Sequence, residues 1–321
     1  MNHEDVSTTK RTKNTKNNRF FAIFVTFVTF VVCLVFATFV VALPAQTFRG
    51  AVTTVEVSVT VTDSAGRLIL GLTRNDFEIF EDGDSQPVTQ FSDTRTPVSV
   101  GVLLDISDSM RGQPIVDARA ALDRFMADLL DPGDEGFVAA FNHLPRVLAA
   151  WTAPPSRLAG RLENERPNGG TAIYDALFAA TPMFQRRHLT RAALIVVSDG
   201  ADTASDHSLA QARETLRRSD AFVYAIAIDS TTEQRVSTRV NPEALREITG
   251  PSGGYTEVVR TSADLGPATE RIAQELNAQY TLGYAAVRPQ DGSWRSIRVR
   301  VKNHDYLARS RRGYFAAVPR T

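Results

Sequence analysis

Three side chains that could hold a metal ion stand at alternate positions directly after an apolar run. The run is 98–104, and the side chains are Asp105, Ser107 and Ser109. This arrangement is typical of a strand that ends in a loop of metal ligands. Magnesium favours oxygen ligands in octahedral geometry and keeps several waters, so one carboxylate and two hydroxyls make a partial cage. The same string is also compatible with a serine-rich turn that caps a helix.

Two further segments carry oxygen ligands at places where an open α/β fold would bring them together. Thr171 follows the pair Gly169-Gly170 at the start of a predicted helix, and Asp199 ends a second apolar run over 194–197. With these two segments the pattern resembles the von Willebrand factor A (VWFA) domain and its metal ion-dependent adhesion site. The resemblance implies a set of five metal ligands, namely Asp105, Ser107, Ser109, Thr171 and Asp199.

The residue types in this set explain what such a site could capture. Three neutral hydroxyls and only two carboxylates leave a divalent ion electrophilic, so an open position can accept a carboxylate from a partner protein. We expect Mg²⁺, with Mn²⁺ or Ca²⁺ as alternatives. Asp108 lies between the two serines and is expected to face solvent, because alternate residues point in opposite directions. Asp175, one turn into the helix after Thr171, could brace the Thr171 loop.

The central part of the chain alternates apolar strand patterns with amphipathic helix patterns, which indicates a mostly parallel sheet with helices on both faces. The resemblance implies a Rossmann-like, doubly wound order in which the strands ending at Leu104 and Ser198 are neighbours. A short loop over 142–145 predicts an antiparallel pair at one sheet edge. The predicted strands are 98–104, 136–141, 146–151, 192–198, 221–228 and 254–258, and the predicted helices are 114–130, 172–184, 207–218 and 263–279.

Segments on either side show the two-residue alternation of half-buried strands. Neither is long enough to build a core alone, so we expect 50–96 and 280–318 to pair into one small β-sandwich with an A domain, 97–279, inserted between them. The segments 71–83, 279–284 and 312–315 resemble bacterial VWFA-related proteins abundant in Acidobacteria. That resemblance bears on the architecture more than on the ligand.

The amino terminus predicts a membrane segment. Residues 1–19 are polar and basic, and 20–43 contain no charged residue. At about 1.5 Å per residue the second segment is long enough to cross the roughly 30 Å hydrocarbon core. The preceding positive charges would leave 1–19 in the cytoplasm as a basic tail and send the remainder outward. We expect either a single-pass inner-membrane protein or a secreted or periplasmic one cleaved near Ala45, in both cases in the cell envelope.

Composition and the absence of known catalytic motifs limit the kinds of partner and of chemistry that we expect. The formal net charge is zero, which gives no reason to expect a nucleic-acid partner. The single cysteine, Cys33, excludes a disulfide within the chain. The sequence contains no GxSxG, HExxH, CxxC or Walker motif, so we expect no enzyme. The expected function is a binding or adhesion module of the cell envelope that captures protein ligands through the metal. The alternatives are an envelope scaffold with a structural metal and, less favoured, a metal-dependent hydrolase with Asp108 or Asp202 as base.

Overall fold

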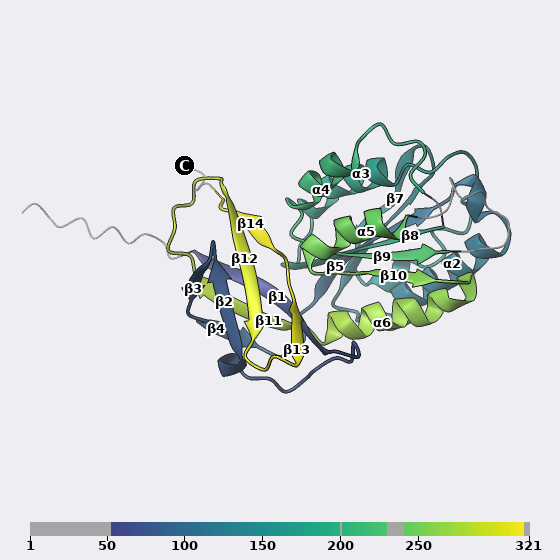
Figure 1. The fold of residues 1–321 in the computed structure, drawn as a ribbon. Helices are drawn as coiled ribbons and strands as arrows, with labels where there is room; N and C mark the ends of the chain where they lie inside the picture. The colour runs from purple at the N-terminus through teal and green to yellow at the C-terminus, as the bar shows by residue number, and fades with distance from the viewer. Residues whose placement is uncertain (1–52, 200, 230–240, 318–321) are drawn as a thin grey trace, which may run out of the picture. The chain divides into compact units, whose positions relative to one another are not determined.

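The computed structural model describes residues 53–199, 201–229 and 241–317. Strands and helices alternate in the middle of the described chain, and strands dominate its two ends (Figure 1). The middle contains β5 (Val98–Asp105), α2 (Gln113–Arg124), β6 (Glu135–Phe141), β7 (Pro145–Thr152), α3 (Ile173–Phe184), β8 (Arg191–Ser198), α4 (Leu209–Leu216), β9 (Phe222–Ile228), α5 (Pro242–Thr249), β10 (Thr256–Val259) and α6 (Leu265–Asn277). We call this part the α/β unit.

The α/β unit is built on one six-stranded sheet with the order β10-β9-β8-β5-β6-β7. All neighbouring strands in it are parallel except β6 and β7, which are antiparallel at one edge. Every residue of β5, β8 and β9 is buried. Burial on both faces explains why these strands read as continuous apolar runs. The predicted mixed α/β fold with a mostly parallel sheet is confirmed.

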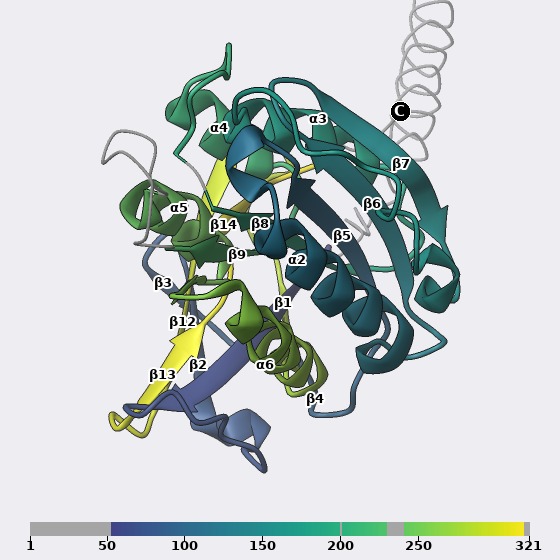
Figure 2. The same ribbon diagram turned by 90° about the vertical axis from the view of Figure 1, so that its right-hand side faces the viewer.

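Helices cover both faces of this sheet (Figure 2). The apolar side chains of α2 and α6 pack on one face, in a core that includes Val102 and Ile226. Those of α3, α4 and α5 pack on the other, in a core that includes Leu103 and Leu194. Because successive residues of a strand point to opposite faces, Val102 and Leu103 belong to different cores.

The two ends of the described chain supply eight strands, which form two four-stranded sheets of order β13-β1-β11-β4 and β14-β12-β2-β3. We call them the flanking sheets. They share one hydrophobic core, to which Val57 of β1 and Ile79 of β2 contribute. Their strands are β1 (Thr54–Asp63), β2 (Phe77–Glu81), β3 (Asp84–Gln86), β4 (Gln90–Ser92), β11 (Tyr280–Ala285), β12 (Trp294–Val301), β13 (Tyr306–Arg309) and β14 (Gly313–Phe315).

The connections between the α/β unit and the flanking sheets lie side by side. β4 is the last strand before the unit and β11 is the first after it, and the two are antiparallel neighbours with Phe91 opposite Leu282. The unit therefore leaves and rejoins the same sheet at adjacent strands.

The structure differs from the predicted elements at two places. The helix predicted over 114–130 ends at Arg124, and 125–129 continue as a π-helical segment. The helix α5 lies where no element is predicted. Its start carries a cap signal, since the side chain of Asn241 accepts a hydrogen bond from the backbone N–H of Ala244 and Pro242 follows at the first turn.

The membrane segment predicted over 20–43 lies outside the described residues, as does the basic tail over 1–19. Within the described ranges, none of the helices combines the length and the apolar character needed to cross a bilayer.

Candidate metal centre

The predicted ligands lie at the carboxyl ends of two neighbouring parallel strands. β5 ends at Asp105 and β8 ends at Ser198, one residue before Asp199. The two strands pair directly, with Leu104 opposite Val197. From β5 the chain moves outward to β6 and β7, then returns to β8 on the other side, so the strand order reverses between β5 and β8. In open α/β sheets this is where ligands bind.

Asp105 is fully buried and is held by hydroxyl and backbone donors. Its Oδ1 accepts a hydrogen bond from the backbone N–H of Ser107 at 2.8 Å, and its Oδ2 accepts one from Ser198 Oγ at 2.6 Å. No basic side chain of the described residues forms an ion pair with it. Burial raises the pKa of Asp105 to about 7, against the opposing effect of these hydrogen bonds, and the nearby charge of Asp199 adds to the rise. A bound cation would favour the ionised carboxylate here.

Hydroxyl groups connect the two strand ends. Ser107 Oγ lies 2.9 Å from Ser109 Oγ, and Ser109 Oγ donates to Asp199 Oδ1 at 2.7 Å. Ser107 and Asp199 are buried, whereas Ser109 is half-buried. Four of the five predicted ligands are thus brought into one hydrogen-bonded group that opens toward the surface at Ser109.

Thr171 is buried and is placed mainly by backbone contacts of its loop. The backbone N–H of Asn168 donates to Ile106 O, and that of Asp108 donates to Gly169 O, each at 2.9 Å. The loop that carries Thr171 therefore lies against the loop that carries the two serines. Gly169 has φ of +75°, and a Cβ atom there would stand 2.4 Å from His143 Nδ1, so this close approach requires glycine.

The neighbouring carboxylates have other roles in the structure. Asp108 is exposed, and it pairs with Arg111 at 2.8 Å. Asp202 Oδ2 accepts hydrogen bonds from the backbone N–H of Tyr174 at 3.1 Å and from Ser205 Oγ at 2.6 Å. Asp202 thereby ties the segment after Asp199 to the start of α3.

Asp175 braces a different loop from the one expected. It accepts hydrogen bonds from the backbone N–H groups of Asp206 and His207, and from His207 Nδ1 at 2.7 Å. It therefore holds the segment before α4 rather than the Thr171 loop itself. That segment also carries Thr203, whose backbone N–H donates to Thr171 O at 2.8 Å.

Sequence reasoning missed Ser198 as a part of the site. Its hydroxyl donates to Asp105, which lies 93 positions earlier in the chain. The only signal in the sequence is its place directly before Asp199 at the end of the apolar run. Its partner becomes evident only when the register of β5 and β8 is known.

The chemistry of the group fits a hard divalent cation. Each of the five predicted ligands would offer an oxygen atom to the ion, and oxygen is the ligand atom that Mg²⁺ prefers. Two of the five side chains are carboxylates and three are hydroxyls. Histidine, cysteine and carboxylate side chains do not gather in threes or more at any metal-sized site within the described residues. A site here depends on the hydroxyls of Ser107, Ser109 and Thr171 as much as on the carboxylates.

Known proteins resemble the chain in this same region. Residues 100–201 match the family model of the von Willebrand factor type A domain. Among solved structures, von Willebrand factor type A from Catenulispora acidiphila is 14% identical with a TM-score of 0.51, covering 82% of this chain and 75% of that chain. Proximal thread matrix protein 1 from the mussel byssus is 15% identical with a TM-score of 0.50, covering 61% of this chain and 50% of that chain.

An aerotolerance-related membrane protein from Bacteroides fragilis is 22% identical with a TM-score of 0.47, covering 56% of this chain and 98% of that chain. No match to the chain was found among curated proteins. At these identities the structural likeness concerns the fold alone. The family match and the sheet architecture together show that this chain contains a von Willebrand factor type A domain.

Proposed function

We propose that the chain is a binding module that captures a protein partner through a divalent metal held at the carboxyl edge of the parallel sheet. The observation that carries this proposal is the buried carboxylate of Asp105, which accepts a hydrogen bond from the Ser107 backbone N–H and is connected through the hydroxyls of Ser107 and Ser109 to Asp199. A buried carboxylate without a basic partner is costly unless a cation or a proton compensates it. A partially closed group of oxygens that opens at Ser109 supplies a place for that cation.

Each residue of the site would have its own role in holding the ion. Asp105 and Asp199 supply the negative charge, and Ser107, Ser109 and Thr171 supply neutral oxygens. When bound, the ion would supply an electrophilic position for a carboxylate of the partner. Asp202 and Asp175 would keep the loops in place through the backbone contacts described above. We place this activity in the cell envelope on the strength of the charge-free segment over 20–43 and the basic residues before it.

Metal binding is the first test. We expect the purified full-length chain to bind Mg²⁺ in isothermal titration calorimetry, and Mn²⁺ in electron paramagnetic resonance. Asp105→Asn keeps the shape of the side chain but removes its charge, so it should weaken Mg²⁺ binding by about 100-fold or more. Thr171→Ala should weaken binding by about 10-fold.

The matched control is Asp108→Asn, which removes a carboxylate from the same loop that faces solvent and pairs with Arg111. It should bind Mg²⁺ like the unmodified chain. If Asp105→Asn bound the metal as tightly as Asp108→Asn does, the proposed site would be wrong.

Capture of a partner is the second part of the same test. Envelope proteins retained by the immobilised chain in Mg²⁺ should be released by EDTA, and Thr171→Ala should retain less of them. Retention that is the same with Mg²⁺, with EDTA and with Thr171→Ala would favour the alternative of a scaffold whose metal only orders the loops. A soluble peptide with a single glutamate should compete, whereas the same peptide with glutamine should not.

A further inference from the structure

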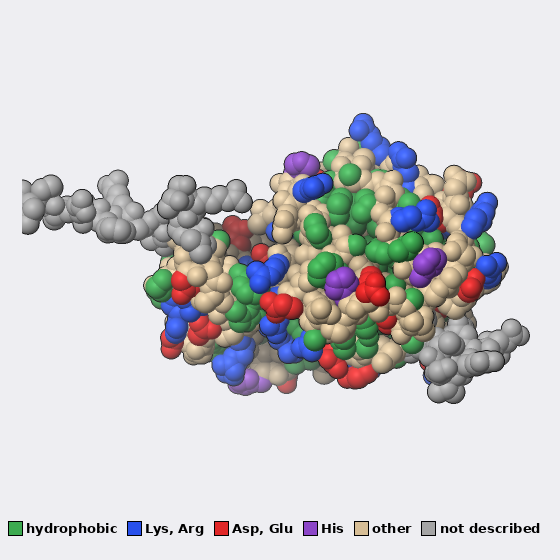
Figure 3. All heavy atoms as spheres, turned by 90° about the horizontal axis from the view of Figure 1, so that it is seen from above, with side chains coloured by type: hydrophobic (Ala, Val, Ile, Leu, Met, Phe, Trp, Pro, Cys, Tyr) green, Lys and Arg blue, Asp and Glu red, His purple; other side chains and the backbone are tan. Residues whose placement is uncertain are grey.

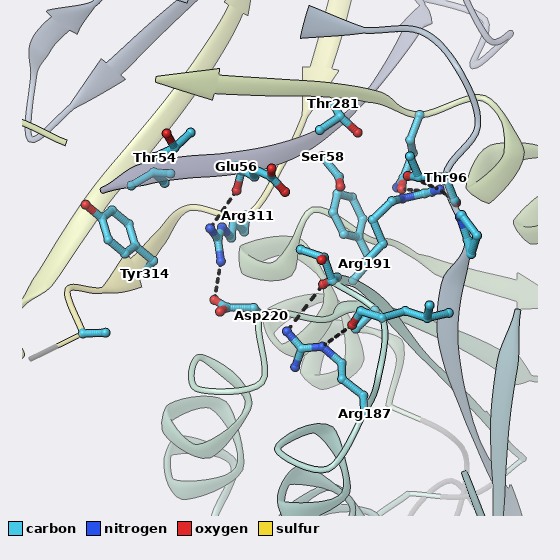
Figure 4. A pocket seen from close by; sticks show the side chains of 18 of the residues that line it. Thr54, Glu56, Ser58, Thr96, Arg187, Arg191, Asp220, Thr281, Arg311 and Tyr314 are labelled. Carbon is cyan, nitrogen blue, oxygen red and sulfur yellow. Dashed lines mark hydrogen bonds and ion pairs between the residues drawn. The ribbon is translucent and has the colours of Figure 1, made fainter. Parts of the chain in front are cut away.

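A cleft lies at the amino-terminal ends of the parallel strands, opposite the end that carries the candidate metal centre. It has a volume of about 570 Å³, within the usual range for small-molecule sites. One wall comes from the flanking sheets, including Thr54, Ser58 and Thr281 (Figure 4). The other comes from segments that precede β5, β8 and β9, where Thr96, Arg187 and Asp220 lie.

The alternation of β1 explains the polar character of the first wall. Val55, Val57 and Val59 point into the core shared by the flanking sheets. Thr54 and Ser58 point the other way, as expected for a strand with one buried face, and they line the cleft. On a sheet facing open water these hydroxyls would only be hydrated. Here the α/β unit stands opposite them, and they line the cleft together with Glu56, which lies between them on β1.

Three arginines line the cleft, and only one of them has a carboxylate partner. Arg311 forms an ion pair with Asp220, and its other terminal nitrogen donates to the backbone oxygen of Glu56 at 2.9 Å (Figure 4). Arg187 donates to backbone oxygens, including those of Phe184 at 2.9 Å and Ser219 at 3.1 Å. Those oxygens hold its position but do not neutralise its charge.

Arg191 is the most buried of the three, with 8% of its surface exposed. One terminal nitrogen donates to Leu276 O and to Gln279 Oε1, each at 2.6 Å, and the other donates to the backbone oxygen of Thr96. Within the described ranges its Nε and that of Arg311 are buried without a hydrogen-bond partner, and neither Arg187 nor Arg191 forms an ion pair there. Burial lowers the pKa of Arg187 and lowers that of Arg191 to about 10, so Arg191 remains protonated at neutral pH.

These observations leave Arg187 and Arg191 without a carboxylate partner among the described residues, in a cleft of mixed polar and apolar lining whose acidic residues are Glu56 and Asp220. Buried charges are normally paired, because an unpaired ion loses its hydration without gaining a partner. Guanidinium groups match carboxylates and phosphates. The hydroxyls on the facing wall both donate and accept hydrogen bonds, which suits a ligand that itself carries several hydroxyls.

We propose that this cleft binds an acidic sugar, with its carboxylate or phosphate directed to Arg187 and Arg191 and its hydroxyls directed to Thr54, Ser58 and Thr281. The site is separate from the candidate metal centre and needs no metal. Its two walls come from different units, so only the assembled chain forms it.

Calorimetric titration of the full-length chain, in EDTA and at low salt, tests the proposal. The probes are glucuronic acid, glucose 6-phosphate, glucose and inorganic phosphate. We expect at least one of the two acidic sugars to bind with a Kd of about 1 mM or tighter. Glucose lacks the charge and inorganic phosphate lacks the sugar hydroxyls, so each should bind about 10-fold more weakly or not at all. Tighter binding of glucuronic acid would identify the anionic group as a carboxylate, and tighter binding of glucose 6-phosphate would identify it as a phosphate.

Variants separate a site from a general attraction of anions. Arg187→Gln should weaken binding about 10-fold, whereas Arg186→Gln removes the adjacent exposed arginine and should leave it unchanged. Ser58→Tyr keeps every arginine and adds a bulky ring to the wall of the cleft, so it should abolish binding with the thermal unfolding temperature preserved. Asp105→Asn should bind the sugar normally, which keeps this proposal distinct from the metal site.

Several results would overturn the proposal. If neither acidic sugar bound, the proposed site would be wrong. If glucose bound as tightly as the acidic sugars, the ligand's charge would have no role in binding. If inorganic phosphate bound as tightly as the acidic sugars, the sugar hydroxyls would have no role in binding. Unchanged binding in a folded Ser58→Tyr variant would place the ligand elsewhere.

Discussion

Two buried carboxylates, Asp105 at the carboxyl end of β5 and Glu135 at the amino end of β6, have pKa values shifted in opposite directions. Asp105 has hydroxyl donors and a second carboxylate nearby, and its pKa is raised, mainly by burial. Glu135, at the start of β6, accepts hydrogen bonds from Ser99 Oγ at 2.6 Å and from the backbone N–H and Nδ1 of His188, both at 2.7 Å. Burial acts to raise the pKa of Glu135, but the hydrogen bonds outweigh it and the pKa is lowered.

The lowered pKa of Glu135 predicts a pH-dependent contribution to stability. A carboxyl group whose pKa is lower in the folded state stabilises it above the unfolded pKa, near 4.5, and loses that contribution as pH falls through the folded value. Glu135→Gln should therefore lower the free energy of unfolding by about 1 to 3 kcal/mol at pH 7. The difference from the unmodified chain should shrink as the pH falls below about 4.5.

Urea unfolding at a series of pH values measures this difference. Glu78→Gln, on an exposed position of β2, is the control and should change stability little at any of them. A Glu135→Gln deficit that did not shrink on acidification would show that the ionised carboxylate is not what stabilises the fold.

The spacing along one segment was enough to group Asp105, Ser107 and Ser109, because these residues directly follow one strand. Thr171 and Asp199 joined them only through the resemblance to a family. Ser198 was missed because its contact with Asp105 depends on the register of β5 against β8. The five-residue ligand set stays a prediction until a metal is measured.

At the scale of elements, β5 depends on a residue without a side chain at its centre. A Cβ atom on Gly101 would lie 2.3 Å from Phe137 Cε1 and 3.0 Å from Leu194 Cδ1. Phe137 itself packs edge-on against Trp151 and Phe184, so it has little freedom to move. The glycine lets a large ring from the neighbouring strand β6 lie across β5.

Gly101→Ala should therefore destabilise the chain by about 1 to 3 kcal/mol, the usual range for overpacking a core. The matched control is Gly266→Ala in α6, where a Cβ atom would meet nothing within 4 Å. Alanine favours helices, so that change should stabilise by up to about 1 kcal/mol. Thermal unfolding of the two variants checks the difference, and a stable Gly101→Ala protein would show that the β5–β6 packing can adjust.

Strongly periodic elements were predictable and short or irregular ones were not. β5, β8 and β9 are apolar throughout because the sheet is covered on both faces, and the sequence shows this directly. The π-helical segment over 125–129 keeps the apolar pattern of the helix before it, so periodicity could not reveal the change. The helix α5 has eight residues, too few for a repeating pattern.

At the scale of the whole described molecule, one buried carboxylate joins the flanking sheets to the α/β unit. Glu275 of α6 accepts hydrogen bonds from Thr60 Oγ at 3.2 Å and from the Tyr224 hydroxyl at 2.8 Å, and it forms an ion pair with Arg309. Thr60 and Arg309 belong to β1 and β13, whereas Tyr224 belongs to β9. Burial and the neighbouring Glu275 raise the pKa of Tyr224, so it stays a hydrogen-bond donor.

Removing this carboxylate should cost much of the stability. Glu275→Ala leaves Arg309 without its partner and should lower the free energy of unfolding by about 3 to 5 kcal/mol. Glu247→Ala breaks an exposed ion pair with Arg213 and should cost less than about 1 kcal/mol. Urea unfolding compares them, and equal costs would mean that the Glu275 contacts do not join the two units.

The adjacent exit and return of the α/β unit also determine how it would carry tension. A pull on the two ends of the described chain would act first on the flanking sheets, because β1 and β14 belong to those sheets and β1 pairs directly with β13. A pull on a partner, if one is captured at the candidate metal centre as proposed, would instead enter the α/β unit and leave it through its two covalent connections to the flanking sheets. A pull on the ends of the described chain would therefore load the flanking sheets before the α/β unit, whereas a pull on a bound partner would be divided between the connections to β4 and β11.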